Sequence, residues 1–561
     1  MDFHRGCMRA RVDIALLLTV LAASLLPAVP VALRGDITVR HILDTGSGGN
    51  SIRIARDPSD AFLYYLRQSG SIYRLTVEDG SGSTSERIYQ GSDTGISSAT
   101  GFAFGPDGTV YIVGTQASGS TNVATIRAGV RSAPGSDARA WATVAMTEAY
   151  PRSNTAFDHN WNGIAVSPDG EHLYIAAGSR TDHGEVQAAG GAFPETREVP
   201  LTAAIFRIPS SARNLLLEND EDAVRPYIFV RGVRNSFDPA FSPSGDLFAG
   251  ENSGDRDDSE ELNWLREGRH YGFPWRMGGL DTPQQFPGYD PEADKLVDHD
   301  FYAYQRGFFH DDPSYPPPPP SVDFTEPCLN FGPDADSYRD PATGDVLDAG
   351  ARATPLATFT AHRSPLGLVF DRESALGGDL RGDAFILGWT RGDPTGATVN
   401  GPFEDPGQDL LHLEIELPGD ACHITVTRIV QGFTNPIDAE IVRNRIYVLE
   451  HGGNGAVWEI TLPGETAPAL RRGFVNDDAQ ADISDGVAIL LALFAGESLM
   501  CADAADVDDT GAVDITDGVY WLQHLFQGGP APPDPYGACG LDDTPDGEGD
   551  LGCEVSAVCG A

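Results

Sequence analysis

The residues whose types and spacing most clearly allow chemistry lie near the carboxyl end of the chain. Asp506, Asp508, Thr510, Gly511, Asp514 and Asp517 stand at positions 1, 3, 5, 6, 9 and 12 of one loop. Oxygen ligands at these spacings can surround a hard cation, and glycine at the sixth position permits a sharp turn. The pattern predicts a calcium site whose ligands are Asp506, Asp508, Thr510, Asp514 and Asp517.

A weaker copy of this loop comes 32 residues earlier, where Asp482-Ile-Ser-Asp-Gly-Val parallels Asp514-Ile-Thr-Asp-Gly-Val. The copy keeps Asn476, Asp478, Asp482 and Asp485, but Phe474 replaces the first aspartate and Ala479 replaces the glycine. We therefore expect one good calcium site and one weak or lost site. Each loop leads into an amphipathic helix. An acidic solvated turn is the alternative interpretation of the second loop.

The paired loops end in Asp where an EF-hand ends in Glu, and in this they resemble a dockerin. The resemblance implies docking onto a cohesin-like or cell-surface partner, in the manner of polysaccharide-degrading assemblies. A generic anchoring or spacer unit is the alternative.

A second informative stretch is 232–274. Gly-Val-Arg-Asn at 232–235 precedes an apolar strand, a Ser-Gly-Asp turn and a second strand, and an acidic run then leads to Glu-Glu-Leu-Asn-Trp-Leu and Arg-His-Tyr-Gly-Phe-Pro. This block resembles the soluble glucose/sorbosone dehydrogenases, which are quinoprotein sugar oxidases built on a six-bladed β-propeller. The resemblance covers about 44–462 and is strongest over 159–178, 232–274 and 364–390. It implies a sugar substrate, the cofactor pyrroloquinoline quinone (PQQ) and an external electron acceptor.

Oxidation of a sugar hydroxyl needs a base, a hydride acceptor and positive charge near the reduced acceptor. The resemblance implies that His159, in Phe157-Asp-His-Asn-Trp-Asn-Gly, is the base, and an imidazole titrates near neutrality. Arg234 would be the catalytic cation. His183 is a rival base, but its Thr-Asp-His-Gly-Glu setting predicts a solvated turn. A structural histidine and a surface arginine are the alternatives.

The same resemblance implies cofactor contacts at Asn235, Asn252, His362 and Arg391, and a structural calcium site at Glu261 and Tyr271. The chain departs from the family in two places. Ser253-Gly254 stands where the family has Gly-Pro, and Lys295, inside the insertion, is the only lysine. Either an arginine replaces the lysine that the glucose enzymes place on the quinone, or the chemistry differs.

The elements that must position these residues are repeated hairpins: two apolar strands joined by a turn such as Pro-Asp-Gly. The six copies begin at Ile52, Gly101, Gly163, Pro239, Leu366 and Pro436. Six repeats predict an all-β fold, a six-bladed β-propeller, followed by a small α-helical dockerin-like calcium-binding domain. A β-sandwich with long loops is the second choice. Residues 280–355 interrupt the repeat and are expected to be a lid over the channel or a disordered loop.

Length and charge are consistent with this division. The chain has 561 residues, too many for one core, and a net charge of −44 from 82 acidic and 38 basic residues. This excess of negative charge argues against nucleic acid as a partner and favours calcium binding.

We expect a signal peptide at 1–33, the propeller at 36–463, a linker at 464–471, the dockerin-like repeats at 472–530 and a cysteine-containing tail at 531–561. A retained N-terminal anchor is the alternative to the signal peptide, and no later segment predicts a membrane span. The six cysteines that follow the signal suggest disulfides, four of them within the last 61 residues. These features predict a protein that is secreted, periplasmic or on the cell surface.

The leading hypothesis is an exported PQQ-dependent aldose dehydrogenase. A non-catalytic propeller that binds sugar or protein, and a calcium-dependent lactonase, are the alternatives.

Overall fold

A computed structural model describes most of the chain after its first 28 residues. The described residues are 29–46, 50–60, 62–78, 82–133, 135–392, 401–403, 405–464, 470–476, 478, 480–499, 501–540, 551, 553 and 558–559. Residues 1–28 of the predicted signal and 465–469 of the predicted linker lie outside this set, whereas the last residues of the predicted signal include the short strand β1 (Val31–Ala32).

The predicted six-bladed β-propeller is confirmed, with six blade sheets among the described residues. The first blade contains β3 (Ser51–Arg56), β4 (Leu63–Arg67), β5 (Ile72–Thr76) and β6 (Thr84–Tyr89). The second contains β7 (Ala99–Phe104), β8 (Val110–Ser118), β9 (Thr121–Arg131) and β10 (Arg139–Thr147), with the short β11 (Tyr150–Pro151) and β15 (Leu215–Leu217). The third contains β12 (Trp161–Val166), β13 (His172–Ala177), β14 (Ala204–Pro209) and β16 (Ile228–Arg231).

The fourth blade contains β17 (Ser236–Phe241), β18 (Leu247–Glu251) and β19 (Glu261–Leu265). The fifth contains β25 (Pro365–Phe370), β26 (Ala384–Gly388), β27 (Asp409–Glu416) and β28 (His423–Gln431), with β1 (Val31–Ala32) and β22 (Leu329–Pro333) on β28. The sixth contains β29 (Pro436–Val442), β30 (Arg445–Glu450), β31 (Ala456–Thr461) and β2 (Thr38–Asp44). Each predicted hairpin supplies the first two strands of a blade.

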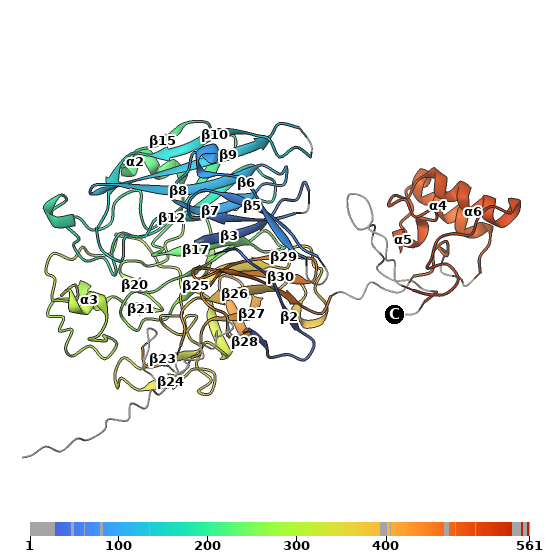
Figure 1. Cartoon of the computed structure of the whole chain (residues 1–561). Coiled ribbons are helices and arrows are strands. Elements are labelled where there is room, and N and C mark those ends of the chain that lie inside the picture. Colours follow the sequence, from blue (N-terminus) through green and yellow to red (C-terminus); the bar gives the residue numbers. More distant parts are fainter. Residues whose placement is uncertain are drawn as a thin grey trace, which may run out of the picture. The chain divides into compact units, whose positions relative to one another are not determined.

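The ring is closed by its inner strands and by the N-terminal strand β2. The inner strands β3, β7, β12, β17, β25 and β29 contact one another in that order, and β29 returns to β3. Strand β2 pairs antiparallel with β31, so the dark-blue strand lies beside the orange strands as the outer strand of the last blade (Figure 1). Closure of this kind leaves few exposed sheet edges.

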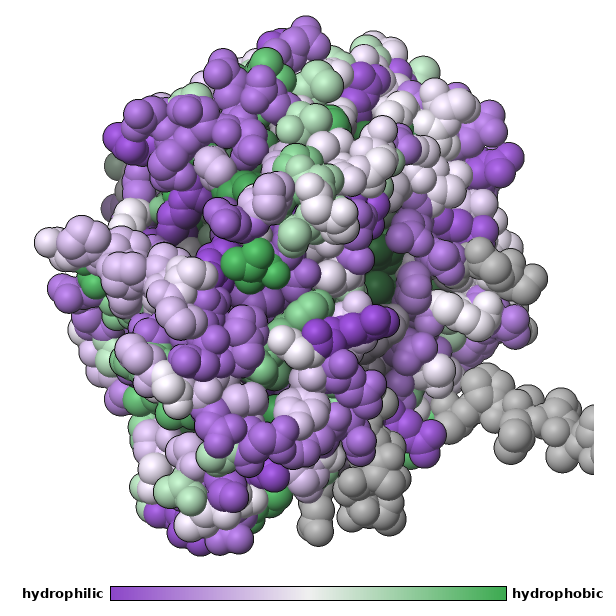
Figure 2. All heavy atoms as spheres, turned by 90° about the vertical axis from the view of Figure 1, so that its left-hand side faces the viewer, coloured by the Kyte–Doolittle hydropathy of each residue, from purple (hydrophilic) through white to green (hydrophobic). Residues whose placement is uncertain are grey.

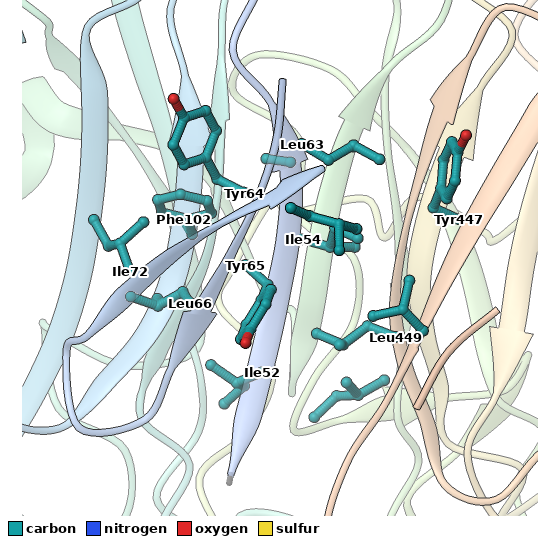
Figure 3. Packing of buried hydrophobic residues seen from close by; sticks show 14 of the residues in the cluster. Ile52, Ile54, Leu63, Tyr64, Tyr65, Leu66, Ile72, Phe102, Tyr447 and Leu449 are labelled. Atoms are coloured by element: carbon teal, nitrogen blue, oxygen red, sulfur yellow. The ribbon is translucent and has the colours of Figure 1, made fainter. Parts of the chain in front are cut away.

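Apolar side chains fill the space between neighbouring blades. Ile52, Tyr65 and Leu66 of the first blade pack toward Leu449 of the sixth, and Phe102 of the second lies in the same cluster (Figure 3). Carboxylates also join blades: Asp438 accepts a hydrogen bond from the Ile54 amide at 2.7 Å. The inner strands of the first and sixth blades are therefore held both by apolar burial and by a buried hydrogen bond between them.

The region 280–355 is a folded insertion between the fourth and fifth blades, so the disordered alternative is wrong. Its elements, with the strand just before it, are β20 (Arg276–Met277), β21 (Leu280–Asp281), the 3₁₀ turn η3 (Pro283–Gln285), α3 (Tyr302–Gln305), β22, β23 (Ser337–Arg339) and β24 (Val346–Asp348). Phe157, Val297, Ala303 and Phe309 form its small apolar core. The remaining short elements of the propeller are α1 (Gly91–Thr94), η1 (Ala189–Gly191), α2 (Glu221–Val224) and η2 (Arg225–Tyr227), and η4 (Gly378–Leu380) lies in a segment that groups with the second unit.

A second compact unit comprises 463–561 together with 375–381. Its helices are α4 (Ile483–Ala495), α5 (Ala502–Ala505) and α6 (Ile515–Gln527), and α4 and α6 lie side by side around Trp521 (Figure 1). Disulfides join Cys501 to Cys553 and Cys539 to Cys559 here, and Cys328 to Cys422 in the propeller. The expected disulfides and the stapled C-terminal unit are thus confirmed. Among the described residues, no helix is long and apolar enough to cross a membrane.

Candidate functional site

His159 lies just before the inner strand β12, at the hub. Its Nδ1 is 3.1 Å from the Ser179 carbonyl oxygen and 3.2 Å from the Ser179 hydroxyl. A carbonyl can only accept, so Nδ1 carries the proton and Nε2 keeps its lone pair. Gly178 makes this placement possible, because a Cβ there would lie 2.4 Å from the His159 Cβ.

Arg234 lies just before the inner strand β17 of the next blade, and it is buried. Its carbonyl oxygen accepts a hydrogen bond of 2.7 Å from the Ser179 amide, so Ser179 contacts both predicted catalytic residues. The Arg234 guanidinium donates to the Asp182 carbonyl at 2.7 Å, to Asp182 Oδ1 at 3.0 Å and to the Asn252 carbonyl at 3.1 Å. The imidazole and the guanidinium therefore converge from neighbouring blades, but the guanidinium is already paired.

Charge and burial set the protonation of His159. Burial and then the positive charge of Arg234 lower its pKa to about 3. The imidazole is therefore neutral near pH 7, with Nε2 available as a proton acceptor. An anion bound beside Arg234 would offset that positive charge and raise the pKa of His159, which would make it a stronger base.

Three asparagine side chains form a chain of amides across the hub. Asn162 donates to Asn235 Oδ1 at 3.0 Å, Asn235 donates to Asn252 Oδ1 at 2.7 Å, and Asn252 donates to the Pro365 carbonyl at 3.3 Å. The structure thus brings Asn235 and Asn252 together beside Arg234. Asn162 was missed in the sequence, although it lies three residues after His159.

The other two predicted cofactor contacts differ in their surroundings. His362 precedes β25, and its Nε2 is 2.8 Å from Asp257 Oδ1 while its ring packs edge-on against Phe301 of the insertion. Arg391 is exposed and its backbone bridges to Gly407. The residues that follow it, 393–400, lie outside the described part of the chain.

Glu261 begins β19 and lies beside a second buried carboxylate, Glu251. Both accept from the Asn263 amide, at 2.9 and 3.1 Å. Burial raises the pKa of Glu251 to about 7, and burial together with Glu251 raises the pKa of Glu261 further above its ordinary range. Two negative charges so close together in a buried site are unfavourable, and a bound cation would reduce the repulsion between them.

The Tyr271 side chain does not join Glu261. The Tyr271 hydroxyl contacts the Trp264 carbonyl and accepts from the Arg266 amide at 2.9 Å. Trp264 is three residues along β19 from Glu261, and a strand rises about 3.3 Å per residue. The Tyr271 hydroxyl is therefore directed away from Glu261, and the calcium site expected at these two residues stays a prediction.

The setting predicted for His183 is also wrong, because this residue is buried rather than in a solvated turn. With Asp182, Arg234 and Arg256 it lines a cavity that the insertion residues Gln284 and Phe309 close. The cavity volume is about 10 Å³, which is room for one water. Figure 2 shows the face that carries the insertion, which is mostly hydrophilic with a few apolar side chains beside a hollow.

The predicted calcium loop in the C-terminal unit has three converging carboxylates. Asp506, Asp508 and Asp517 each place an oxygen within 4.8 Å of the others. Burial and the neighbouring Asp508 and Asp506 raise the pKa of Asp517 to about 6. Asp514 instead caps α6, accepting from the Thr516 amide at 2.6 Å, and the Thr510 amide donates to Asp506 Oδ1 at 3.0 Å. Asp514 is not one of the three converging carboxylates, and the prediction of Thr510 as a ligand stays a prediction.

Comparison with known proteins agrees with the resemblance seen in the sequence. Residues 52–301 match the family model described as Glucose / Sorbosone dehydrogenase. No curated protein matches the chain.

Solved structures with a similar fold include several sugar dehydrogenases. The apo form of the soluble aldose sugar dehydrogenase from Escherichia coli is 14% identical, with 76% of this chain and 99% of that chain covered and a TM-score of 0.44. The PQQ-bound aldose sugar dehydrogenase from Streptomyces coelicolor is 17% identical, with 77% and 99% covered and a TM-score of 0.42. The PQQ domain of pyranose dehydrogenase from Coprinopsis cinerea, in its holo form, is 14% identical, with 77% and 97% covered and a TM-score of 0.46.

Proposed function

We propose that the propeller is a quinoprotein dehydrogenase of the glucose/sorbosone type that oxidises a hydroxyl of an aldose or a related sugar. The observation that carries this proposal is the convergence of His159 and Arg234, with a neutral imidazole whose Nε2 is free to accept a proton. The family match over 52–301, which includes both residues, supports it.

The chemical types of the side chains at the hub suit a flat anionic cofactor. Arg234 supplies a buried cation, and the amides of Asn235 and Asn252 supply neutral hydrogen-bonding groups beside it. Three buried acceptor atoms at this end of the channel, Glu260 Oε2, Asn263 Oδ1 and Ser253 Oγ, have no hydrogen-bond partner among the described residues, which suits an added cation such as calcium.

His159 would take the hydroxyl proton through Nε2. Arg234 would bind the anionic cofactor and stabilise the negative charge that develops on it. PQQ, when bound, supplies the acceptor for the hydride. Electrons would then leave to an external acceptor.

A non-catalytic sugar- or protein-binding propeller is the second candidate. Two observations favour it: Asp182 already neutralises Arg234, and the cavity next to Arg234 is about 10 Å³. A quinone would need the insertion to move away from Arg234.

Reconstitution separates the two candidates. The purified protein is mixed with PQQ and calcium, and reduction of a dye is followed with a panel of aldoses. The proposal predicts turnover in the wild type and in His310→Ala, whose side chain is exposed, and loss of at least 100-fold in His159→Ala. Full activity of His159→Ala would exclude it as the base, and no turnover with any sugar despite PQQ binding would favour the binding propeller.

We also propose that the C-terminal unit binds one calcium ion and docks the enzyme onto a cohesin-like or cell-surface partner, in an exported protein engaged in polysaccharide breakdown. The converging carboxylates support the calcium site. Exposed apolar side chains at matching positions of α4 and α6 support docking: Ile483 and Ile515, Val487 and Val519, Phe494 and Phe526. Both helices thus offer an apolar face that a partner could cover.

Calorimetry tests both parts. We expect the C-terminal unit to contribute one calcium site, so that Asp508→Asn binds one calcium fewer than the wild type and the matched variant Asp478→Asn of the weaker loop binds the same number. Binding to a panel of cohesins should require calcium and should weaken at least tenfold in Phe494→Ser/Phe526→Ser. A generic spacer would bind none of them.

A further inference from the structure

One chain of polar contacts connects the insertion to Arg234. Gln284 of the insertion lies with Oε1 3.1 Å from His183 Nε2, and His183 Nδ1 lies 2.8 Å from Asp182 Oδ2. The other carboxylate oxygen of Asp182 accepts from Arg234 at 3.0 Å. His183, Asp182, Gln284 and Arg234 are all buried, so these contacts are shielded from water.

The orientation of Gln284 shows which atom faces His183. Its Nε2 donates to the Phe308 carbonyl at 3.2 Å, and its Oε1 also accepts from the His310 amide at 3.2 Å. Both His183 nitrogens therefore face acceptors. An imidazole can donate from both nitrogens only when it is doubly protonated, so the geometry requires an imidazolium at position 183.

The charges around His183 agree with this state. Burial alone would lower the pKa of His183, but the nearby Glu185 and the hydrogen bond to Asp182 outweigh it and raise the pKa. Asp182 and Glu185 face the ring from its own loop, and Arg234, Arg256 and Asp258 line the same cavity. From the insertion come Gln284, Phe309, whose ring is stacked on the imidazole at 4.3 Å, and Tyr315, whose hydroxyl donates to the His183 carbonyl at 2.6 Å.

The insertion covers the predicted site through three further contacts. Val297, Ala303 and Phe309 pack on Phe157, two residues before His159. The Ala303 amide donates to Asp255 at 2.7 Å, and Phe301 packs on His362. Release of the insertion would therefore uncover the surroundings of His159, of Asp255 and of His362 together.

We propose that His183 is a positioning residue, an ionic clamp that as an imidazolium holds the insertion closed and, through Asp182, fixes the guanidinium of Arg234. Loss of its proton removes one donor, so either the Gln284 or the Asp182 bond is lost and the insertion opens. Its consequence for catalysis rests on the proposed function, but the clamp itself does not.

The sign of the pH dependence follows from the raised pKa. The clamp contributes in full below the ordinary histidine pKa of about 6.5, and its contribution is lost as the pH rises through the higher value of the closed state. Opening coupled to release of one proton becomes up to about tenfold more frequent per pH unit between these two pKa values and is constant above the higher one.

Hydrogen exchange of the full chain, without cofactor, tests the clamp. Amides of 296–315 are followed from pH 5 to 9, and their rates are corrected for the intrinsic dependence on pH. We expect the corrected exchange rates to rise with pH in the wild type and in the control variant His310→Asn, which alters an exposed histidine of the same segment. His183→Asn, which can still donate to Asp182, should be open at every pH with no such dependence, and Gln284→Leu should be more open than the wild type at pH 5.

Persistence of the wild-type pH dependence in His183→Asn would overturn the proposal, and so would a wild-type insertion whose corrected exchange does not change with pH. The second measurement and Gln284→Leu remain informative even if His183→Asn does not fold. If the hydrogen exchange shows the expected dependence on pH but the protein reduces no dye at any pH, the proposed enzymatic function is rejected and the clamp is still supported.

Discussion

The protonation of His159 gives a prediction that can be worked through in numbers. Its folded pKa of about 3 lies well below the ordinary value of about 6.5, because burial and Arg234 disfavour the charged ring. A lowered histidine pKa means that the unfolded chain takes up the proton first as the pH falls. Folding stability is therefore lost between about pH 6.5 and 3, and the folded state is favoured above this range.

The perturbation is His159→Asn, which keeps a donor for the Ser179 carbonyl and cannot titrate. At pH 7.5 the lowered pKa of His159 has almost no effect on the unfolding free energy of the wild type, whereas at pH 5.0 it reduces that free energy by about 2 kcal/mol. The difference in unfolding free energy between the two proteins should thus shift by about 2 kcal/mol in favour of the variant between these pH values.

Urea unfolding followed by tryptophan fluorescence at pH 7.5 and 5.0 measures this shift and stays above the pI of about 4.4. Trp161 is buried two residues after the substitution and reports on the hub. His310→Asn is the control and should show no shift of this size. A difference that is the same at both pH values would show that His159 is not held neutral by its surroundings.

Three further predictions concern other charged groups. Arg234→Met removes one of the two cations that face the buried Asp182, the other being His183, and should lower the unfolding free energy by up to about 3–5 kcal/mol, part of which Asp182→Asn in the same chain should restore; a loss below 1 kcal/mol would contradict the buried pair. Burial raises the pKa of Glu440 to about 7, so its stabilising contribution is complete below its ordinary pKa and is lost as the pH rises to about 7. Between pH 5 and 8 the unfolding free energy of Glu440→Gln should therefore rise by about 2–3 kcal/mol relative to the wild type, and a constant difference would refute this. Calcium must displace a proton from Asp517, whose pKa is about 6. The calcium affinity measured by calorimetry should therefore fall by up to about tenfold per pH unit below pH 6. An affinity that does not change with pH would argue against Asp517 as a ligand.

Local patterns in the sequence were sufficient for the blades and for three of the converging side chains in the acidic C-terminal loop. Pro, Asp and Gly at a turn and apolar residues on both sides specify a hairpin through short-range sterics, as at Gly163–Gly178. Ligand spacing within one loop likewise fixes which carboxylates converge, so Asp506, Asp508 and Asp517 meet as predicted.

Contacts between distant segments required the tertiary structure. Position 234 could be predicted to face the hub, but its partner Asp182 lies 52 residues earlier and no local pattern links the two. The burial of His183 likewise could not be predicted from its loop, because the neighbouring residues are polar and indicate exposure. His183 is buried by Gln284 and Phe309, which lie more than 100 residues later in the chain.

The sequence by itself thus determined the repeating hairpins, the hub positions of His159 and Arg234 and the acidic loop near the carboxyl end, because each depends on interactions between near neighbours in the chain. The tertiary structure alone decided that Tyr271 turns away from Glu261, that six cysteines form three specific pairs and that the insertion covers the hub. These outcomes depend on which surfaces exclude water when remote segments meet, and burial then sets the charge state of the groups enclosed there.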